Sequence, residues 1–191
     1  ARGYRALSRG GARGDRSCRR TGDRPGPPGH EGRAAAEFCD EVLPRVRTRV
    51  GRTKLLVGCT SLFPLARRLS NMPGVEVLAP TGNIRSLLRR AMVAVAPKRL
   101  GAETQRGLLD AMAAGVPVIT TPEGLDGLPL QHGREIYVEG SPAGFTERLI
   151  ELLQKPALRE AMSTKGRAFI KQVVGTDDGG VHGPGEWLPV V

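Results

Sequence analysis

The chain has 191 residues, which is enough for one globular domain of ordinary size with some residues to spare. Its net charge is +10, of which residues 1–35 contribute +6 through nine arginines and three acidic residues, so about +4 belongs to the rest. The basic character is therefore mostly that of an N-terminal arm. Because Tyr4 is the one aromatic residue of this arm that could stack on a base, specific nucleic-acid binding is disfavoured.

The two ends of the chain differ in composition from its middle. Residues 1–33 are dominated by Gly, Arg and Pro without helical or strand periodicity, which predicts a disordered segment. Residues 174–191 form an irregular tail for which no element is predicted. Our hypothesis is that both ends are translated out of frame, and the alternative is natural disordered tails; the other reading frames of the coding DNA distinguish the two. Because the chain begins with Ala1 and not Met, we expect a fragment or a processed product.

Residues 34–173 show alternating short apolar runs and amphipathic stretches. Phe38, Val42, Val46 and Val50 recur four apart, which predicts one stripe of a helix that Pro44 could kink. Strands are expected within 54–58, 74–80, 92–97, 116–121 and 135–140, and helices around 65–69, 83–91, 103–114, 141–154 and 156–172. Ser141 is a candidate N-cap, followed by Pro142 at the first helical position.

This alternation predicts repeated βαβ units. The expected fold is α/β and Rossmann-like, with a parallel sheet covered by helices on both faces. In such sheets ligands bind outside the carboxyl ends of the strands.

One loop in this pattern has the features of a phosphate site. Lys98, Arg99, Gly101 and Ala102 follow an expected strand, and a helix opens near Glu103 and Thr104. Gly101 would let the backbone approach a ligand closely, and a helix start offers unpaired N–H groups and a positive dipole end. The two basic side chains would add full charges, so the loop predicts binding of a phosphate or pyrophosphate.

Two further groups lie near that loop in the expected fold. Asp110, nearly two turns into the helix, could accept both hydrogens of a ribose diol, although spacing alone favours a solvated helix charge or a structural ion pair. Thr121, Glu123 and Gly124 follow the next strand and would border the same crevice, although a tight turn alone could explain the glycine.

The run LLDAMAAGVPV followed by TPEG resembles the donor-binding domain of GT-B glycosyltransferases of the retaining group 1, or family 4, type. The resemblance covers roughly residues 36–171 and is most specific at LDAMAAGVPVITTPEG. It implies a hexosyltransferase that uses a nucleoside-diphosphate sugar, with no further cofactor and commonly no metal. It also implies a separate N-terminal acceptor domain, which is missing here, so this chain alone is expected to be inactive.

The resemblance assigns roles to individual residues. Asp110 matches the second acidic residue of the family's Glu, seven residues, Glu motif, which binds the nucleotide ribose. The loop beside the diphosphate and donor sugar matches Arg99, Gly101, Ala102, Glu103 and Thr104, and the stretch near the nucleobase matches Ala79, Thr81 and Asn83. No catalytic residue is assigned.

The sequence departs from the family pattern at several positions. Asp110 is one methylene shorter than Glu, and the first acidic position holds Ala102. Glu103 is one place out of register, about 100° away on a helix. Relatives with a Gly-Ala-Gly loop also lack that first acid, but they often carry Lys where this chain has Gly107 beside Arg106. The basic pair that other relatives place earlier in the domain has no counterpart.

Two other functions stay open as alternatives. One is a non-catalytic nucleotide-binding module or a degenerate remnant, which Ala102 and the missing acceptor domain favour. The other, less favoured, is a basic nucleic-acid-binding protein that uses residues 1–33, for which salt-dependent DNA binding would be the test.

The cysteines bear on location and metal content. Cys18, Cys39 and Cys59 are odd in number and show no Cys-x-x-Cys spacing, so neither a disulfide framework nor a zinc site is indicated. This favours a cytoplasmic location. No apolar run approaches the length of a transmembrane helix, and the basic N-terminus lacks a signal peptide's apolar stretch, which leaves peripheral attachment to the inner membrane surface as an option.

Overall fold

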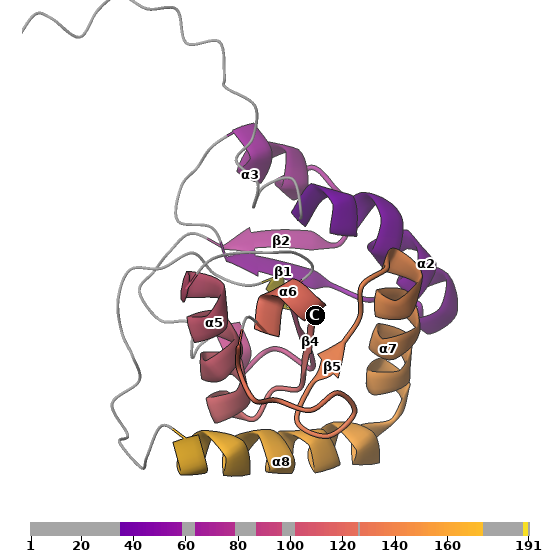
Figure 1. Ribbon diagram of the computed structural model, residues 1–191. Helices are drawn as coiled ribbons and strands as arrows, with labels where there is room; N and C mark the ends of the chain where they lie inside the picture. Colours follow the sequence, from indigo (N-terminus) through magenta and orange to yellow (C-terminus); the bar gives the residue numbers. More distant parts are fainter. Residues whose placement is uncertain are drawn as a thin grey trace, which may run out of the picture.

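Six strands form one sheet at the centre of the molecule (Figure 1). The computed structural model describes residues 35–58, 64–78, 87–96, 102–125, 127–173 and 189–190. The strands are β1 (Leu55–Gly58), β2 (Val75–Leu78), β3 (Ala94–Ala96), β4 (Val118–Thr120), β5 (Tyr137–Val138) and β6 (Pro189–Val190). The helices are η1 (Phe38–Val42), α2 (Leu43–Val50), α3 (Pro64–Ser70), α5 (Ala102–Ala114), α6 (Pro122–Leu125), α7 (Pro142–Gln154) and α8 (Pro156–Val173).

The sheet order is β2-β1-β6-β3-β4-β5. β1 runs parallel to β2, and β3, β4 and β5 run parallel to one another. β6 is antiparallel to both β1 and β3, so these two point in the same direction. The α/β fold with a parallel sheet is confirmed, but the sequence predicted no element at Pro189–Val190.

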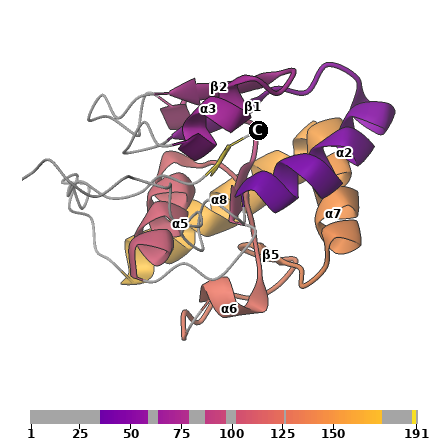
Figure 2. The same cartoon turned by 90° about the horizontal axis from the view of Figure 1, so that it is seen from above.

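Alternate residues of each strand feed two separate apolar cores. Leu55, Val57 and Ile119 belong to one core cluster, and Leu56 and Val118 belong to the other. Because successive strand residues point to opposite faces, both faces of the sheet must be covered. Figures 1 and 2 show α2 and α7 together on one side and α5 on the other, and α8 contacts both α5 and α7.

The expected helix at residues 38–50 is present and contains a widened turn just ahead of Pro44. Phe38–Val42 is a π-helix, in which the N–H of Leu43 donates to the carbonyl of Phe38. Because proline has no N–H to donate to the carbonyl four residues earlier, and because its ring crowds that carbonyl, Pro44 accounts for the wider turn just ahead of it. The helix still buries its predicted stripe, since Phe38, Val42 and Val46 are at most 3% exposed.

Most other predicted elements are confirmed within a residue or two. Ser141 caps α7 by accepting from the N–H of Gly144 at 3.1 Å, with Pro142 at the helix start. Of the helix expected at 83–91, Leu87 and Leu88 are helical, and residues 83–86 lie outside the described part of the chain. The four-residue helix α6 was not predicted. None of the helices that the structure describes is long and apolar enough to cross a membrane.

Leu149 tests the core between α7 and the sheet. Its side chain is fully buried in the cluster that also contains Phe38, Val46 and Ile119. We predict that Leu149→Ala lowers the free energy of unfolding by about 2–5 kcal/mol, because it removes apolar contacts and leaves a cavity. In urea denaturation the control Val173→Ala, at a side chain 56% exposed, should change stability by about 0.5 kcal/mol or less. Equal effects of the two substitutions would contradict this packing.

Cys39 gives the fold a pH dependence. Burial, followed by the nearby charge of Asp40, raises the pKa of its thiol to about 11. In the unfolded chain the thiol of Cys39 ionises near the ordinary pKa of cysteine. The contribution of the buried, neutral thiol to the free energy of unfolding is therefore complete below that pKa and is lost as the pH rises toward 11. We predict a fall in unfolding free energy between about pH 9 and pH 11 that is smaller in Cys39→Ala. The same fall in both proteins would contradict the assignment.

Candidate functional site

The carboxyl ends of five strands lie along one edge of the sheet. Because β1 to β5 all point the same way, their last residues, Gly58, Leu78, Ala96, Thr120 and Val138, lie along that edge. Each of the helices α3, α5, α6 and α7 is the next described element after one of these strands, namely β1, β3, β4 and β5. This is the edge at which open parallel sheets bind ligands.

The sequence-predicted site residues fall into two groups in the structure. Lys98, Arg99 and Gly101, together with Ala79, Thr81 and Asn83, lie outside the described residues. The other group is placed: Ala102, Glu103 and Thr104 form the first turn of α5, Asp110 lies further along that helix, and Thr121, Glu123 and Gly124 lie between β4 and the end of α6. The structure therefore brings α5 and the turn after β4 to the same edge.

The helix α5 presents one buried and one partly exposed side along its length. Leu108, Ala111 and Met112 are at most 2% exposed and belong to the core cluster beneath the helix. Asp110, between them in sequence, is only partly buried. At 1.5 Å per residue it stands about 12 Å along the helix from Ala102. The carboxylate is thus carried on a rigid element at a fixed distance from the helix start.

The turn after β4 is held by two threonines. The hydroxyl of Thr120 donates to the carbonyl of Ala96 at 3.4 Å, which ties the end of β4 to the end of β3. Thr121 accepts the N–H of Gly124 through its hydroxyl at 3.3 Å and its carbonyl at 3.0 Å. Both threonines are buried, at 0% and 7% exposure, so the turn has a fixed shape. Sequence reasoning missed Thr120, although a polar residue ending an apolar strand was a usable signal.

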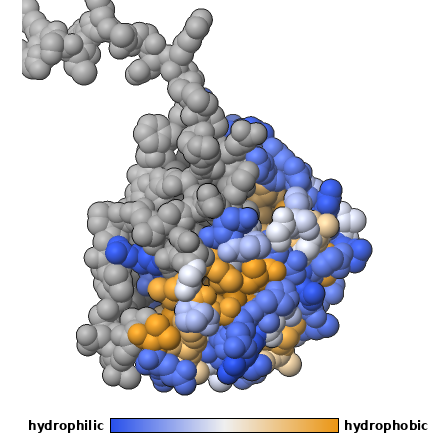
Figure 3. All heavy atoms as spheres, in the orientation of Figure 1, coloured by the Kyte–Doolittle hydropathy of each residue, from blue (hydrophilic) through white to orange (hydrophobic). Residues whose placement is uncertain are grey.

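Gly124 is required in this turn by close packing. A β-carbon added there would collide with the hydroxyl oxygen of Thr120. The turn interpretation of this glycine, left open by the sequence, is therefore supported by a specific contact. Figure 3 shows apolar side chains gathered on the face that carries α5 and α6, where the partly buried Leu109, Leu125 and Leu128 pack against the core.

An ion-pair network fastens α7 to β5 beside the same edge. Arg148 donates to Glu139 at 3.0 Å and to Glu151 at 2.8 Å, and it lies 5.0 Å above the ring of Tyr137. Hydrogen bonds from Lys155 and from Arg148 lower the pKa of Glu151, and burial, more than the charge of Glu151, raises the pKa of Tyr137. The side chains of this network form hydrogen bonds and ion pairs with one another, so we assign the network a structural role.

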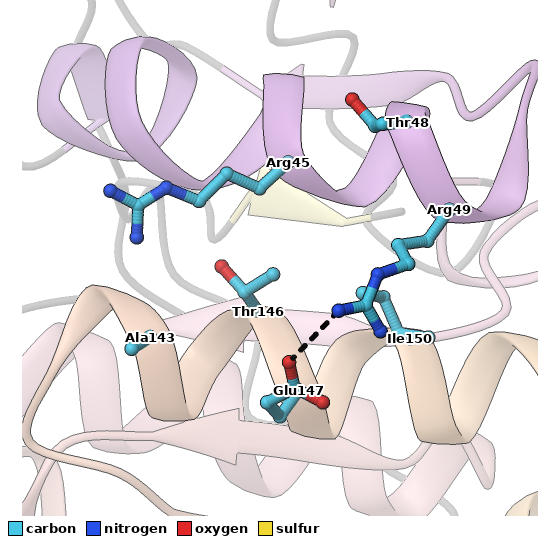
Figure 4. Close-up of a pocket in the computed structure, with 7 residues that line it drawn as sticks. All are labelled: Arg45, Thr48, Arg49, Ala143, Thr146, Glu147 and Ile150. Carbon is cyan, nitrogen blue, oxygen red and sulfur yellow. Dashed lines mark ion pairs between the residues drawn. The ribbon is translucent and has the colours of Figure 1, made fainter.

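A hollow on the outer surface lies between α2 and α7 (Figure 4). It measures about 300 Å³ and is lined by Arg45, Thr48, Arg49, Ala143, Thr146, Glu147 and Ile150. Across it Arg49 reaches Glu147 at 3.9 Å, and both side chains are more than 60% exposed, so this pair contributes little. None of the lining residues belongs to the predicted site, and the hollow is separate from the turn after β4.

Gly124→Ala tests the packing at the turn. We predict a loss of about 1–3 kcal/mol in unfolding free energy, because the added methyl group meets the buried side chain of Thr120. The cost should be smaller in a Thr120→Ala background, which removes the colliding oxygen. Gly140→Ala is the matched control, since the nearest atom to its added carbon is Cδ of Pro122 at 4.0 Å. A cost unchanged by Thr120→Ala would contradict the contact.

The chain is similar in sequence to one known protein family and in fold to several solved structures. A family model described as glycosyl transferases group 1 matches residues 29–155. Among solved structures, HepE from Anabaena in complex with UDP-glucose aligns with a TM-score of 0.54 at 13% identity, covering 70% of this chain and 40% of that one. HepE with UDP and glucose gives a TM-score of 0.55 at 15% identity, with coverages of 70% and 39%.

A third solved structure is the C-terminal domain of a glycosyl transferase group 1 family protein, LpcC, from Francisella tularensis. It aligns with a TM-score of 0.48 at 20% identity, covering 59% of this chain and 61% of that one. The chain thus spans less than two thirds of each of these structures. No curated protein sequence matches it. The family model covers well over half of the 191 residues, and the chain therefore belongs to the glycosyl transferases group 1 family.

Proposed function

We propose that this chain is the donor-binding domain of a glycosyltransferase and holds a nucleoside-diphosphate sugar at the carboxyl edge of its sheet. The carrying observation is that the run Leu109–Gly124, on which the resemblance rests, folds as the second half of α5, β4 and the start of α6, so that Thr121–Gly124 lies at that edge beside the start of α5. HepE, which shares the fold, is described in complexes with UDP-glucose and with UDP and glucose.

The diphosphate is assigned to the start of α5. The helix has 13 residues, so its first turn directs a positive dipole end and unpaired N–H groups toward the loop after β3. From the loop, Lys98 and Arg99 would add positive charges near the start of α5. Together these groups would stabilise the negative charge that develops on the leaving diphosphate, in the role that a metal ion can fill elsewhere.

The remaining parts of the donor follow from the positions of the other residues. Asp110 is assigned to the ribose hydroxyls, about two turns along α5 from the phosphates. Thr121, Glu123 and Gly124 border the donor sugar from the neighbouring turn. Ala79, Thr81 and Asn83, which come after β2 in the sequence, are assigned to the nucleobase.

Sugar transfer requires a second domain in this proposal. The chain spans 40% and 39% of the two HepE structures that share its fold, and we propose that the acceptor is bound by parts that lie outside it. We expect the chain by itself to bind the donor and release no sugar. We propose that the transferred group is a hexosyl group, as in the hexosyltransferases that the sequence resembles.

Ligand-induced stabilisation tests the proposed site. We predict that one of UDP, GDP and ADP, at 100 times its dissociation constant, stabilises the chain by about 2.7 kcal/mol, measured as a rise in Tm. Asp110→Ala should remove this rise, and Asp110→Asn should weaken it because the amide has no negative charge and only one acceptor oxygen in place of two. The readout is the shift on adding ligand, which is independent of any change in baseline stability.

The control for this experiment is Asp40→Ala. Asp40 lies on η1, is exposed, and pairs with Arg68 at 3.0 Å, away from the carboxyl edge. The ligand-induced shift should persist in that variant. A folded chain that no diphosphate stabilises, or a shift that Asp110→Ala leaves intact, would contradict the proposed site and favour a degenerate remnant.

A further inference from the structure

The residues that precede the strands lie at the amino edge of the sheet, which is the edge opposite the proposed donor site. Because β1 to β5 all point the same way, the loops that lead into them meet there. Leu56 on β1 and Ala94 on β3 both pair with Val190. Lys54 and Met92, each two residues earlier, are therefore level with each other at this edge, separated by two strand spacings, about 9–10 Å.

Four exposed cations at the amino edge form no ion pair with any of the described residues. Arg52 and Lys54 precede β1, and Arg89 precedes β3. Arg167 of α8 lies against Gly115, just ahead of β4, since a β-carbon added to this glycine would collide with the guanidinium group of Arg167. Because no carboxylate neutralises these four charges, the amino edge attracts anions.

An apolar side chain is exposed among these cations. Met92 is 43% exposed, and in the described part of the chain Val173 is the other large hydrophobic residue that is exposed. Met92 follows Arg89 by three residues and is level with Lys54. A methionine side chain is flexible and polarisable, so it adapts to irregular apolar surroundings. The partner that fits this edge therefore offers negative charge and an apolar environment together.

An anionic lipid surface combines these two properties. Basic residues are attracted to negatively charged headgroups, and apolar side chains enter the boundary between headgroups and acyl chains. Single-stranded nucleic acid fits less well, because the described loops ahead of the strands contain no aromatic side chain that could stack on a base. We propose that the amino edge rests on an anionic membrane surface, with Met92 inserted and the donor site directed away from the lipid. Attachment through this edge does not depend on donor binding.

Cosedimentation of the full chain with vesicles tests this surface. The probe is vesicles of equal parts phosphatidylglycerol and phosphatidylcholine, and the control is vesicles of phosphatidylcholine alone. We expect the chain to sediment with the anionic vesicles and not with the neutral ones. Arg52→Gln/Arg89→Gln should lower the partition coefficient roughly 10- to 30-fold, because each cation near an anionic surface contributes about fivefold. No sedimentation with the anionic vesicles would overturn the proposal.

The matched control is Arg45→Gln/Arg106→Gln, which removes the same charge from positions away from the amino edge. Arg106 stands about 13 Å along α5 from Gly115, and Arg45 lines the hollow with Ala143, in the first turn of α7 after β5. We expect this variant to lower the partition coefficient about twofold or less. Equal losses in the two double variants would mean that net charge governs binding, and would overturn the proposal.

The fluorescence of an added tryptophan locates the inserted residue. On adding anionic vesicles, the emission of Met92→Trp should shift to shorter wavelength and be quenched by brominated lipid, whereas the exposed Ala143→Trp should show neither change. Trp187 is common to both variants, so the difference between them reports the added residue. Equal changes in both variants, or none in Met92→Trp, would overturn the proposal. Loss of single-stranded DNA binding in Arg52→Gln/Arg89→Gln, with vesicle binding unaltered, would identify a nucleic-acid surface instead.

Discussion

The burial of both faces of one parallel sheet is the constraint on which the rest of this structure depends. Leu56 faces one apolar core while its neighbours Leu55 and Val57 face the other, so neither face can be left to water. Helices from distant parts of the chain must cover both faces, with η1, α2 and α7 on one and α5 on the other. Parallel strands joined by helices place every strand's carboxyl end on one edge, and that edge is where the loops can bind a ligand without disturbing either core.

The proposed site uses groups that the fold holds rigidly and groups that the loops supply. Asp110 is fixed by a helix whose other side is fully buried, and Gly124 is fixed by the two threonines that shape the turn after β4. The hollow between α2 and α7 measures about 300 Å³, and the ion pair across it, between Arg49 and Glu147, is exposed and weak. We base the proposed site on the positions of the strand ends and not on cavity volume.

Sequence patterns predicted the sheet and its helices because each depends on local periodicity. The stripe at Phe38, Val42 and Val46 and the cap at Ser141 are both present as expected. The π-turn at Phe38–Val42 could be anticipated from Pro44 only as a kink, since its form depends on how the flanking residues pack. β6 could not be predicted, because a two-residue strand has no periodicity and its partners lie about 95 and 130 residues away. Within the site, Thr120 and α6 were missed because their roles come from contacts across the strand ends, whereas Asp110 was proposed through the family phrase and stays a prediction.

The most direct test of the central claim is a map of backbone amide chemical shifts during titration with UDP, GDP and ADP in turn. The account predicts that one of them perturbs the amides of Ala102–Asp110 and Thr121–Gly124 in a saturable way, and leaves Arg45, Arg49 and Thr146 between α2 and α7 unchanged. Perturbations centred on that hollow, or none anywhere at high ligand concentration in the folded chain, would contradict a nucleotide site at the carboxyl edge of the sheet.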